Sequence, residues 1–293
     1  MFGSSPASKI SRMEIIISDA KTHLEKSIEL NPDFTAAHFQ LALLLKDQGQ
    51  FKAAQRHLER TIDIDVGYIP GRFQLAILLH EQQALDQARK HYLETIDLDS
   101  HHAEAHFHLA LLLEELEEYG EAKDHFAKAT EIDQNYTKAY YRLARLMIDP
   151  DDYELARQNY QMAIDIDGSL AEAHYYLGKL VAGGRKINED GTFVIEPDYD
   201  LAKKNFRQTI ELDEQNYRAH FNLAKVLATE SDNTQAEGHF KQAIGINPGY
   251  AKAHFHLALL LIEVGRLMPE ETAPQSKQPQ QPAGRPKSRK TGK

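Results

Sequence analysis

Residues 103–133, AEAHFHLALLLEELEEYGEAKDHFAKATEID, contain two apolar stripes separated by a polar break at Glu117 and Glu118. Both stripes have the spacing of one face of an α-helix, because their members recur three or four positions apart. This stretch therefore predicts two antiparallel helices of about 12 to 14 residues joined by a short turn. The first stripe is His106, Leu109, Ala110 and Leu113, and the second is Ala122, Phe126 and Ala129.

The same pattern recurs along the chain with a period of 34 residues. One interval is 46, which is 34 plus an insertion of 12 residues. A fixed period of this length is the mark of a repeat architecture, in which each unit buries its apolar faces against its neighbours. The leucines that define the period are Leu41, Leu75, Leu109, Leu143, Leu177, Leu223 and Leu257.

A small residue follows every one of these leucines, and a second small residue stands later in each full unit. Alanine or glycine where two helices cross lets their axes approach at the short end of the usual ~8 to 10 Å. We therefore expect the two helices of a unit to cross at these positions. The first set is Ala42, Ala76, Ala110, Ala144, Gly178, Ala224 and Ala258, and the second is Ala54, Ala88, Ala122, Ala156, Ala202 and Ala236.

Two further positions recur in the units. A large apolar residue, such as Leu113, stands three residues after the small residue of the Leu-Ala step, and the second helix has an aromatic residue or leucine, such as Phe126. With these features the chain resembles the tetratricopeptide repeat family over residues 20–265. The family's tryptophan-like position is occupied mostly by histidine, and its end-of-unit proline appears only at Pro32 and Pro248. The resemblance implies an all-α, right-handed α-solenoid of tandem 34-residue antiparallel helix pairs.

The repeat divides the chain into three predicted parts. Residues 1–34 form an N-terminal entry helix or half repeat, because residues 20–32 read as a second helix with no Leu-Ala signature before them. Residues 35–268 form six full units plus one final helix, with the insertion near 183–198 as a loop or hairpin. Residues 269–293 form a disordered basic tail rich in Pro, Gln, Ser and Lys.

Composition limits the function classes. The chain has no cysteine, and its wholly apolar runs are far shorter than the roughly 20 residues of a membrane-spanning helix. With no apolar secretory core near the start, a cytoplasmic location is expected. The net charge of −10 is unevenly spread, since residues 269–293 carry +4 and the rest −14. Nucleic acid is therefore expected to contact only the tail.

Catalytic motifs are missing from the sequence, so we predict a protein that is not an enzyme and has no cofactor, no metal site and no small-molecule substrate. His80 and Glu81 begin a zincin-like motif, but Ala84 stands where its second histidine belongs. His102 and His106 are spaced for adventitious metal binding. Packing is the favoured role for histidines that share one slot of the repeat: His38, His106, His174, His220 and His254.

The first helices offer a candidate binding groove. Two residues before each leucine every unit has an aromatic residue, and two after it the residue type changes from apolar to basic and back. The predicted aromatic anchors are Phe39, Phe73, Phe107, Tyr141, Tyr175, Phe221 and Phe255. The residues two after the leucine are Leu43, Ile77, Leu111, Arg145, Lys179, Lys225 and Leu259, and Lys138, Arg142, Arg218 and Lys252 add further positive charge.

We therefore predict a non-enzymatic scaffold that binds a partner's peptide or helix in the concave groove, with an apolar and an acidic stretch. The alternative for these residues is packing between first helices, with the cations paired to nearby acids. A second reading of function is a regulatory or targeting subunit whose basic tail contacts nucleic acid or an anionic membrane while the array recruits an enzyme. Residues 259–262 of the final helix have two interpretations. They contact a partner or, in a homo-dimer, a second copy, or the final helix simply closes the stack.

Overall fold

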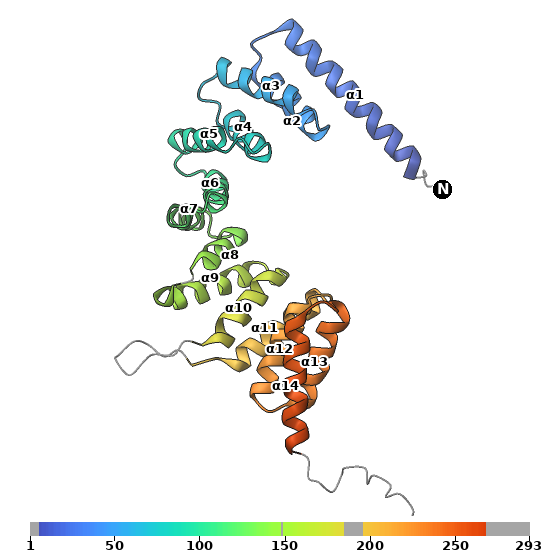
Figure 1. Cartoon of the computed structure of the whole chain (residues 1–293). Coiled ribbons are helices and arrows are strands. Elements are labelled where there is room, and N and C mark those ends of the chain that lie inside the picture. Colours follow the sequence, from blue (N-terminus) through green and yellow to red (C-terminus); the bar gives the residue numbers. More distant parts are fainter. Residues whose placement is uncertain (1–5, 148, 185–195, 268–293) are drawn as a thin grey trace, which may run out of the picture. The chain divides into compact units, whose positions relative to one another are not determined.

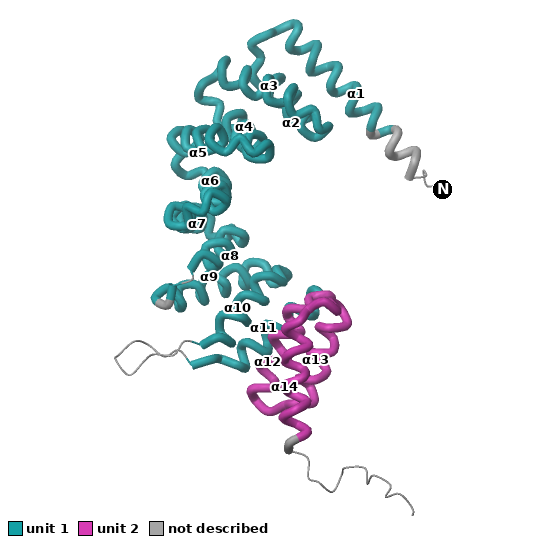
Figure 2. The backbone as a smooth tube through the Cα atoms, viewed as in Figure 1, with its two compact units in different colours: residues 1–214 teal, residues 215–293 magenta. Residues whose placement is uncertain are grey.

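The computed structural model describes residues 6–147, 149–184 and 196–267, and within these ranges it contains fourteen α-helices, one 3-10 turn and no strand (Figure 1). The predicted all-α fold of tandem helix pairs is confirmed. Two compact units are distinguished, Met1–Glu214 and Gln215–Lys293 (Figure 2). The division into residues 1–34, 35–268 and 269–293 stays a prediction, and the tail lies outside the described residues.

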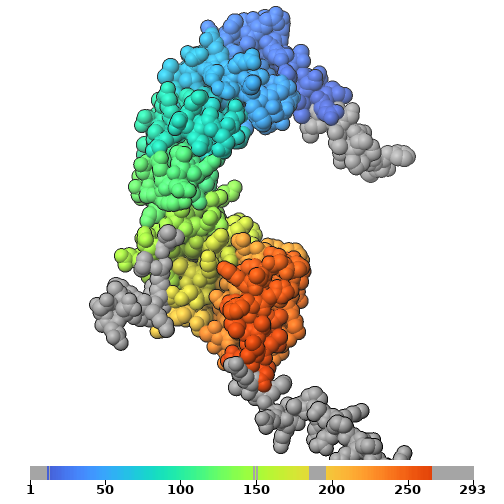
Figure 3. All heavy atoms as spheres, viewed as in Figure 1, coloured from blue at the N-terminus to red at the C-terminus, as the bar shows by residue number. Residues whose placement is uncertain are grey.

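The first unit begins with one long helix, α1 (Pro6–Leu30), which packs against α2. Five helix pairs follow it in chain order, and Figure 3 shows their atoms in contact from one pair to the next. The pairs are α2 (Thr35–Asp47) with α3 (Phe51–Ile64), α4 (Ile69–Glu81) with α5 (Leu85–Leu98), α6 (Ala103–Glu115) with α7 (Tyr119–Ile132), α8 (Thr137–Leu146) with α9 (Tyr153–Ile166), and α10 (Ala171–Gly183) with α11 (Tyr199–Leu212).

The second unit contains one complete pair, α12 (Tyr217–Thr229) with α13 (Asn233–Ile246), and the final helix α14 (Ala251–Leu267). In chain order, α14 is a first helix, because it carries the Leu-Ala step at Leu257 and Ala258. It packs against α13 on one side.

The predicted crossing points are the most deeply buried positions of the pairs. Ala42 and Ala54 of the first pair have no exposed surface, and their counterparts in the other complete pairs are equally well buried. Beside each second-helix alanine stands a large buried side chain, such as Leu58 or Phe126. Burial of these side chains, about 1.5–3 kcal/mol each, holds the two helices of a pair together.

Histidines connect the two helices of a pair across this core. His38 of α2 faces His57 of α3 with 2.9 Å between their Nδ1 atoms, while Nε2 of His38 lies 3.0 Å from the carbonyl oxygen of Pro32. The same arrangement joins His106 to His125. The predicted packing role of this histidine slot is thus what these pairs display.

The turn inside a pair uses a left-handed residue. Gly49 has φ +71°, and the amide of Gln50 donates to the carbonyl oxygen of Leu45 at 2.8 Å, which satisfies the end of α2 in a Schellman motif. Gln83, Glu117 and Ser231 occupy the same place in other pairs, also with positive φ. The sequence pattern did not indicate these residues, because only the first of the four is glycine.

Two units depart locally from the repeat. Helix α8 ends at Leu146, and a 3-10 turn at Pro150–Asp152 follows before α9. Of the insertion near 183–198, residues 185–195 lie outside the described residues. At its base the amide of Asp198 donates to the carbonyl oxygen of Val181 at 3.0 Å, which returns the chain to the end of α10.

Candidate functional site

The first helices of the first unit follow one another along the stack, and polar contacts join α2 to α4, α4 to α6 and α6 to α8. Lys46 of α2 pairs with Glu81 of α4 at 3.0 Å, and His80 of α4 lies 3.1 Å from Glu115 of α6. Arg142 of α8 pairs with Glu114 of α6 at 3.2 Å. We call the surface that α2, α4, α6, α8 and α10 share the first-helix face.

The predicted aromatic anchors lie mainly below this face. Phe73 and Phe107 of the first unit and Phe221 of the second are buried, while Phe39, Tyr141 and Tyr175 are half-buried. Only Phe255 of α14 is largely exposed, at 61 %. The three buried rings therefore lie inside the stack of helices, where they are not accessible to a ligand.

The rings pack against the large side chain of their own second helix and against the turn that leads into the next pair. Phe107 lies 5.5 Å from Phe126 and 4.8 Å from Tyr136, measured between ring centroids. On the other side, Tyr160 of α9 stacks on Tyr176 of the next first helix at 6.3 Å. These ring contacts therefore pack one helix pair against the next.

Two of the predicted cations form a cluster with tyrosines at the junction of α8 and α10. The Arg145 guanidinium lies 5.8 Å from the ring centroid of Tyr141 and 5.5 Å from that of Tyr176. Lys179 places its Nζ 6.0 Å from the Tyr176 centroid. Such cation–π contacts contribute ~0.5–1 kcal/mol at exposed sites. We call these four residues the basic–aromatic cluster.

The cations of this cluster are not neutralised by acids. Within the described residues neither Arg145 nor Lys179 makes an ion pair, although Glu114 contributes an attractive charge near Arg145. Burial raises the pKa of the Tyr141 phenol, and the nearby guanidinium of Arg145 opposes that shift. The Tyr141 phenol therefore stays neutral near pH 7, and Arg145 and Lys179 give the cluster a positive charge.

The other predicted cations are distributed differently. Arg142 is paired with Glu114, while Lys138 is exposed near the start of α8. In the second unit, Lys225 lies 5.8 Å from the ring centroid of Phe221, and Arg218 stacks on Tyr217 at 5.6 Å. Lys252 is exposed at the start of α14.

The apolar part of the first-helix face lies on α2, α4 and α6. Leu43, Ile77 and Leu111 are each half-buried there. Beside them His108 stacks on Tyr92 with 6.1 Å between centroids, and burial followed by the charge of His80 lowers the pKa of His108 to about 4. His108 is therefore neutral near pH 7, which keeps this part of the face free of added charge.

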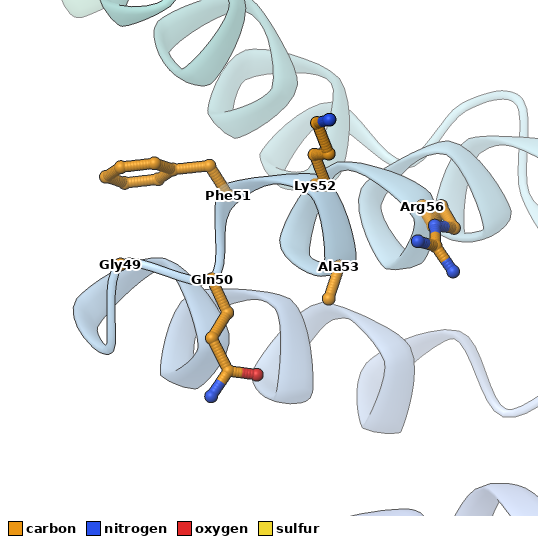
Figure 4. Close-up of a pocket in the computed structure, with 6 residues that line it drawn as sticks. All are labelled: Gly49, Gln50, Phe51, Lys52, Ala53 and Arg56. Atoms are coloured by element: carbon orange, nitrogen blue, oxygen red, sulfur yellow. The ribbon is translucent and has the colours of Figure 1, made fainter.

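The surface hollows of the two units differ in character. One of about 320 Å³ in the second unit is lined by Phe240, His256 and Leu260, with Lys225 and Glu263 among its other residues. A hollow of about 360 Å³ lies at the turn between α2 and α3, at Gly49–Ala53 and Arg56. Figure 4 shows that its side chains point in different directions, so they do not converge on one ligand.

The histidines considered for metal binding are occupied separately. His102 accepts a hydrogen bond from the amide of Ala105, while His106 faces His125. No group of three or more potential metal ligands lies together in the parts of the chain that the structure describes. Among those residues, too, no helix is long and apolar enough to cross a bilayer.

Comparison with known proteins matches the helix pairs to established repeat models. One tetratricopeptide repeat model matches residues 73–137 and 198–251, and a second matches residues 23–56. The chain belongs to the tetratricopeptide repeat family. No curated protein matches it in sequence.

Solved structures of tetratricopeptide repeat proteins share the fold at low identity. The C-terminal part of a TPR repeat-containing protein from Cytophaga hutchinsonii has a TM-score of 0.63 at 15% identity, covering 82% of this chain and 94% of that one. PilF of Pseudomonas aeruginosa has a TM-score of 0.61 at 17% identity, covering 77% of this chain and 97% of that one. YrrB, described as a TPR protein with an unusual peptide-binding site, has a TM-score of 0.58 at 23% identity. The match covers 68% of this chain and 96% of that one.

Together with the helix pairs, these matches support an all-α solenoid fold and a protein–protein interaction scaffold. Stacked pairs of this kind present extended surfaces suited to other proteins. The tetratricopeptide repeat is generally a scaffold fold without catalytic groups of its own.

Proposed function

We propose that this tetratricopeptide repeat protein is a non-enzymatic scaffold whose first-helix face holds a peptide or helix of a partner protein. The apolar stretch of the ligand contacts α2, α4 and α6, and its acidic stretch contacts the basic–aromatic cluster. The observation that carries the proposal is that Arg145 and Lys179 reach this face over tyrosine rings without an acidic partner in the described residues. A cytoplasmic location stays a prediction from the sequence.

The buried rings change how the aromatic residues contribute. Phe73 and Phe107 hold neighbouring pairs in place, so they shape the face from below. The half-buried Tyr141 and Tyr176 are the aromatic side chains that a ligand reaches beside the cations. The peptide-binding site named in the description of YrrB supports the same class of ligand.

A charge reversal tests this proposal with a defined probe. The probe is a labelled peptide with a leucine-rich half and a glutamate-rich half, and its affinity is measured by fluorescence anisotropy. Changing Lys138, Arg145 and Lys179, which all lie on α8 and α10, to Glu is expected to weaken binding at least about tenfold at low salt, which corresponds to ~1.4 kcal/mol. The loss should shrink as salt rises, because exposed charges are screened.

A matched control carries the same charge change on second helices. Lys52 of α3 with Lys204 and Arg207 of α11 are exposed, and their change to Glu should leave the affinity unchanged. Equal affinities for the parent chain and the first-helix variant at low salt would refute the proposed face. Equal losses in both variants would show that the peptide senses only net charge.

The basic tail supports a second candidate function. Residues 269–293 carry six Lys or Arg against two Glu, while the rest of the chain is acidic. A regulatory or targeting subunit would use this tail on nucleic acid or an anionic membrane while the array recruits an enzyme. Deleting residues 283–293 should then abolish salt-sensitive binding to DNA or to anionic vesicles, and an unchanged result argues against this role.

A further inference from the structure

Helix α14 repeats the sequence of earlier first helices but lacks their cover. Its stretch AKAHFHLALLL differs from AEAHFHLALLL of α6 at one position only. In α6 the side chains of Phe107, Ala110 and Leu113 are buried. The equivalent residues of α14 are exposed: Phe255 by 61 %, Leu261 by 46 %, and Ala258 also.

A second helix with a recurring pattern covers this surface in every complete pair. The pattern is Ala-x-x-His/Asn-Leu/aromatic-x-x-Ala/Thr, and its first, fifth and eighth residues are buried throughout. The six examples begin at Ala54, Ala88, Ala122, Ala156, Ala202 and Ala236.

The sequence that follows α14 does not carry this pattern. At the four corresponding positions stand Glu270, Ala273, Pro274 and Lys277. A proline at the fifth position opposes a helix interior, because it lacks the amide donor and clashes with the preceding turn. The covering helix for α14 must therefore be sought elsewhere.

Helix α1 carries the first three elements of the pattern at Ala20, His23 and Leu24, with the small Ser27 in place of Ala or Thr. It packs on α2 in the same way that each second helix packs on the following first helix. The chain before Ala20 continues as the same helix, without the turn that precedes α3. The side that would meet a first helix is open, since Ala20 and His23 are exposed.

We propose that α14 of one molecule pairs with α1 of a second copy, so that a complete repeat is formed between two chains. The pair α2 and α3 is the template, because AAHFQLALLL of α2 agrees with KAHFHLALLL of α14 at eight of ten positions, and Ala-x-x-His-Leu of α3 recurs in α1. The contact is head-to-tail, since it joins two different helices. It therefore differs from the homo-dimer contact through the final helix that the sequence suggested.

The template gives specific contacts for the composite pair. His254 already has its Nε2 3.1 Å from the carbonyl oxygen of Pro248, as His38 has toward Pro32. Its Nδ1 has no recorded partner in the described part of the chain, and His23 of the second copy occupies the place that His57 holds beside His38. Phe255 meets Phe34 of the second copy as Phe39 meets Tyr68, at 5.4 Å between centroids.

A head-to-tail contact has two different sides, so an open assembly of any size keeps one free α1 and one free α14. Such heterologous interfaces build rings or open chains instead of stopping at a dimer. The full-length protein should therefore form species larger than a dimer as its concentration rises.

Two single substitutions test the arrangement by sedimentation velocity over a roughly hundredfold concentration range. Ala20→Glu places a charged side chain on the contact surface of α1, and Ala258→Glu does the same on α14. Both positions are exposed within one chain, so neither change should disturb its fold. Each variant alone is expected to remain monomeric. An equal mixture should give a dimer and nothing larger, because only the intact α14 of one variant and the intact α1 of the other can pair.

Controls and a second readout make the test decisive. Thr22→Glu and Lys252→Glu lie at exposed positions whose counterparts are Arg56 and Glu104, and both should still oligomerise. Because the chain has no cysteine, His23→Cys and His254→Cys should cross-link with a short thiol reagent when mixed. A parent chain that stays monomeric, or oligomers that survive Ala20→Glu, would overturn the proposal.

Discussion

Gly178 shows how one missing methyl group sets the fit of a helix pair. It stands where other first helices have alanine, and a Cβ built there would lie 3.0 Å from Cε1 and 3.1 Å from Cδ1 of Phe206. Phe206 is fully buried, and Asn205 lies 3.3 Å from the same point. In this pair the second helix therefore approaches more closely than an alanine allows.

We predict that Gly178→Ala lowers the free energy of unfolding by about 1 kcal/mol, because the cost of overpacking exceeds the gain in helix propensity. Chemical denaturation measures the change. Gly245→Ala is the matched control, since Gly245 is an exposed helical residue with no atom within 4 Å of the added Cβ. The control should gain about 0.5–1 kcal/mol. A stabilised Gly178→Ala variant would mean that Phe206 can move aside.

The histidine pairs make stability depend on pH. Burial, followed by the charge of a neighbouring histidine, lowers the pKa of both His57 and His106 below the ordinary value of 6.5. Burial also lowers the pKa of His125. The unfolded chain then binds more protons than the folded chain below pH 6.5, so the free energy of unfolding falls as the pH drops.

We expect a lower Tm at pH 5.5 than at pH 7.5, measured by calorimetry. Changing His57 and His125 to Asn should reduce this difference, because α11 already uses Asn205 to bond its first-helix histidine at 2.9 Å. An unchanged pH slope in the double variant would place the titrating groups elsewhere.

The spacing of histidines in the sequence contains a signal for the second-helix histidines that the search for repeats did not use. His57 follows His38, His125 follows His106 and His239 follows His220, each after 19 residues. That interval joins the two helices of a pair. The aromatic anchors posed a harder problem, because periodicity places Phe107 on a helix but leaves open whether its ring points outward or toward Phe126.

At the scale of elements, the turns at Gln83, Glu117 and Ser231 carry backbone strain that the sequence does not show. A residue other than glycine in the left-handed region costs roughly 1–2 kcal/mol. Glu117 has φ +63° at the place where Gly49 has φ +71°. Because the motif requires this conformation to end the first helix, the cost is present in three turns of the described chain.

Glu117→Gly is therefore expected to raise the free energy of unfolding by about 0.5–1 kcal/mol, after the greater freedom of glycine in the unfolded chain is subtracted. Thermal and chemical denaturation should agree on the gain. Gln82→Gly is the control, since Gln82 has φ −88° in the equivalent turn of the α4 and α5 pair and gains no relief. Its stability should fall by roughly 0.4–1 kcal/mol. Similar losses in both variants would contradict the strain at Glu117.

The helix pairs themselves followed directly from the sequence, because leucine and alanine recur at fixed intervals and bury the same surface each time. Helix α8 was less predictable, since Pro150 interrupts a unit that otherwise keeps the 34-residue period. The candidate binding face was only partly readable. Its cations are real surface features at Arg145 and Lys179, whereas Phe73 and Phe107 serve the packing of the pairs.

At the scale of the whole molecule, repeat architecture predicts local rather than global loss of stability. In a stack where each pair contacts only its neighbours, a defect spreads by nearest-neighbour contacts. The chain also divides into two compact units, and Phe240 belongs to the second, where it lies 5.9 Å from Phe221 and 6.1 Å from His256 between centroids.

We predict that Phe240→Ala, which should cost about 3–5 kcal/mol, accelerates amide hydrogen exchange in α12, α13 and α14 while α2 to α7 keep their protection. Phe126→Ala, at the equivalent buried position of α7, should have the converse effect, with the loss centred on α6 and α7. Mass spectrometry of exchanged peptides locates both changes. Equal acceleration along the entire chain in either variant would show that it unfolds as one cooperative body, and would rule out the nearest-neighbour picture.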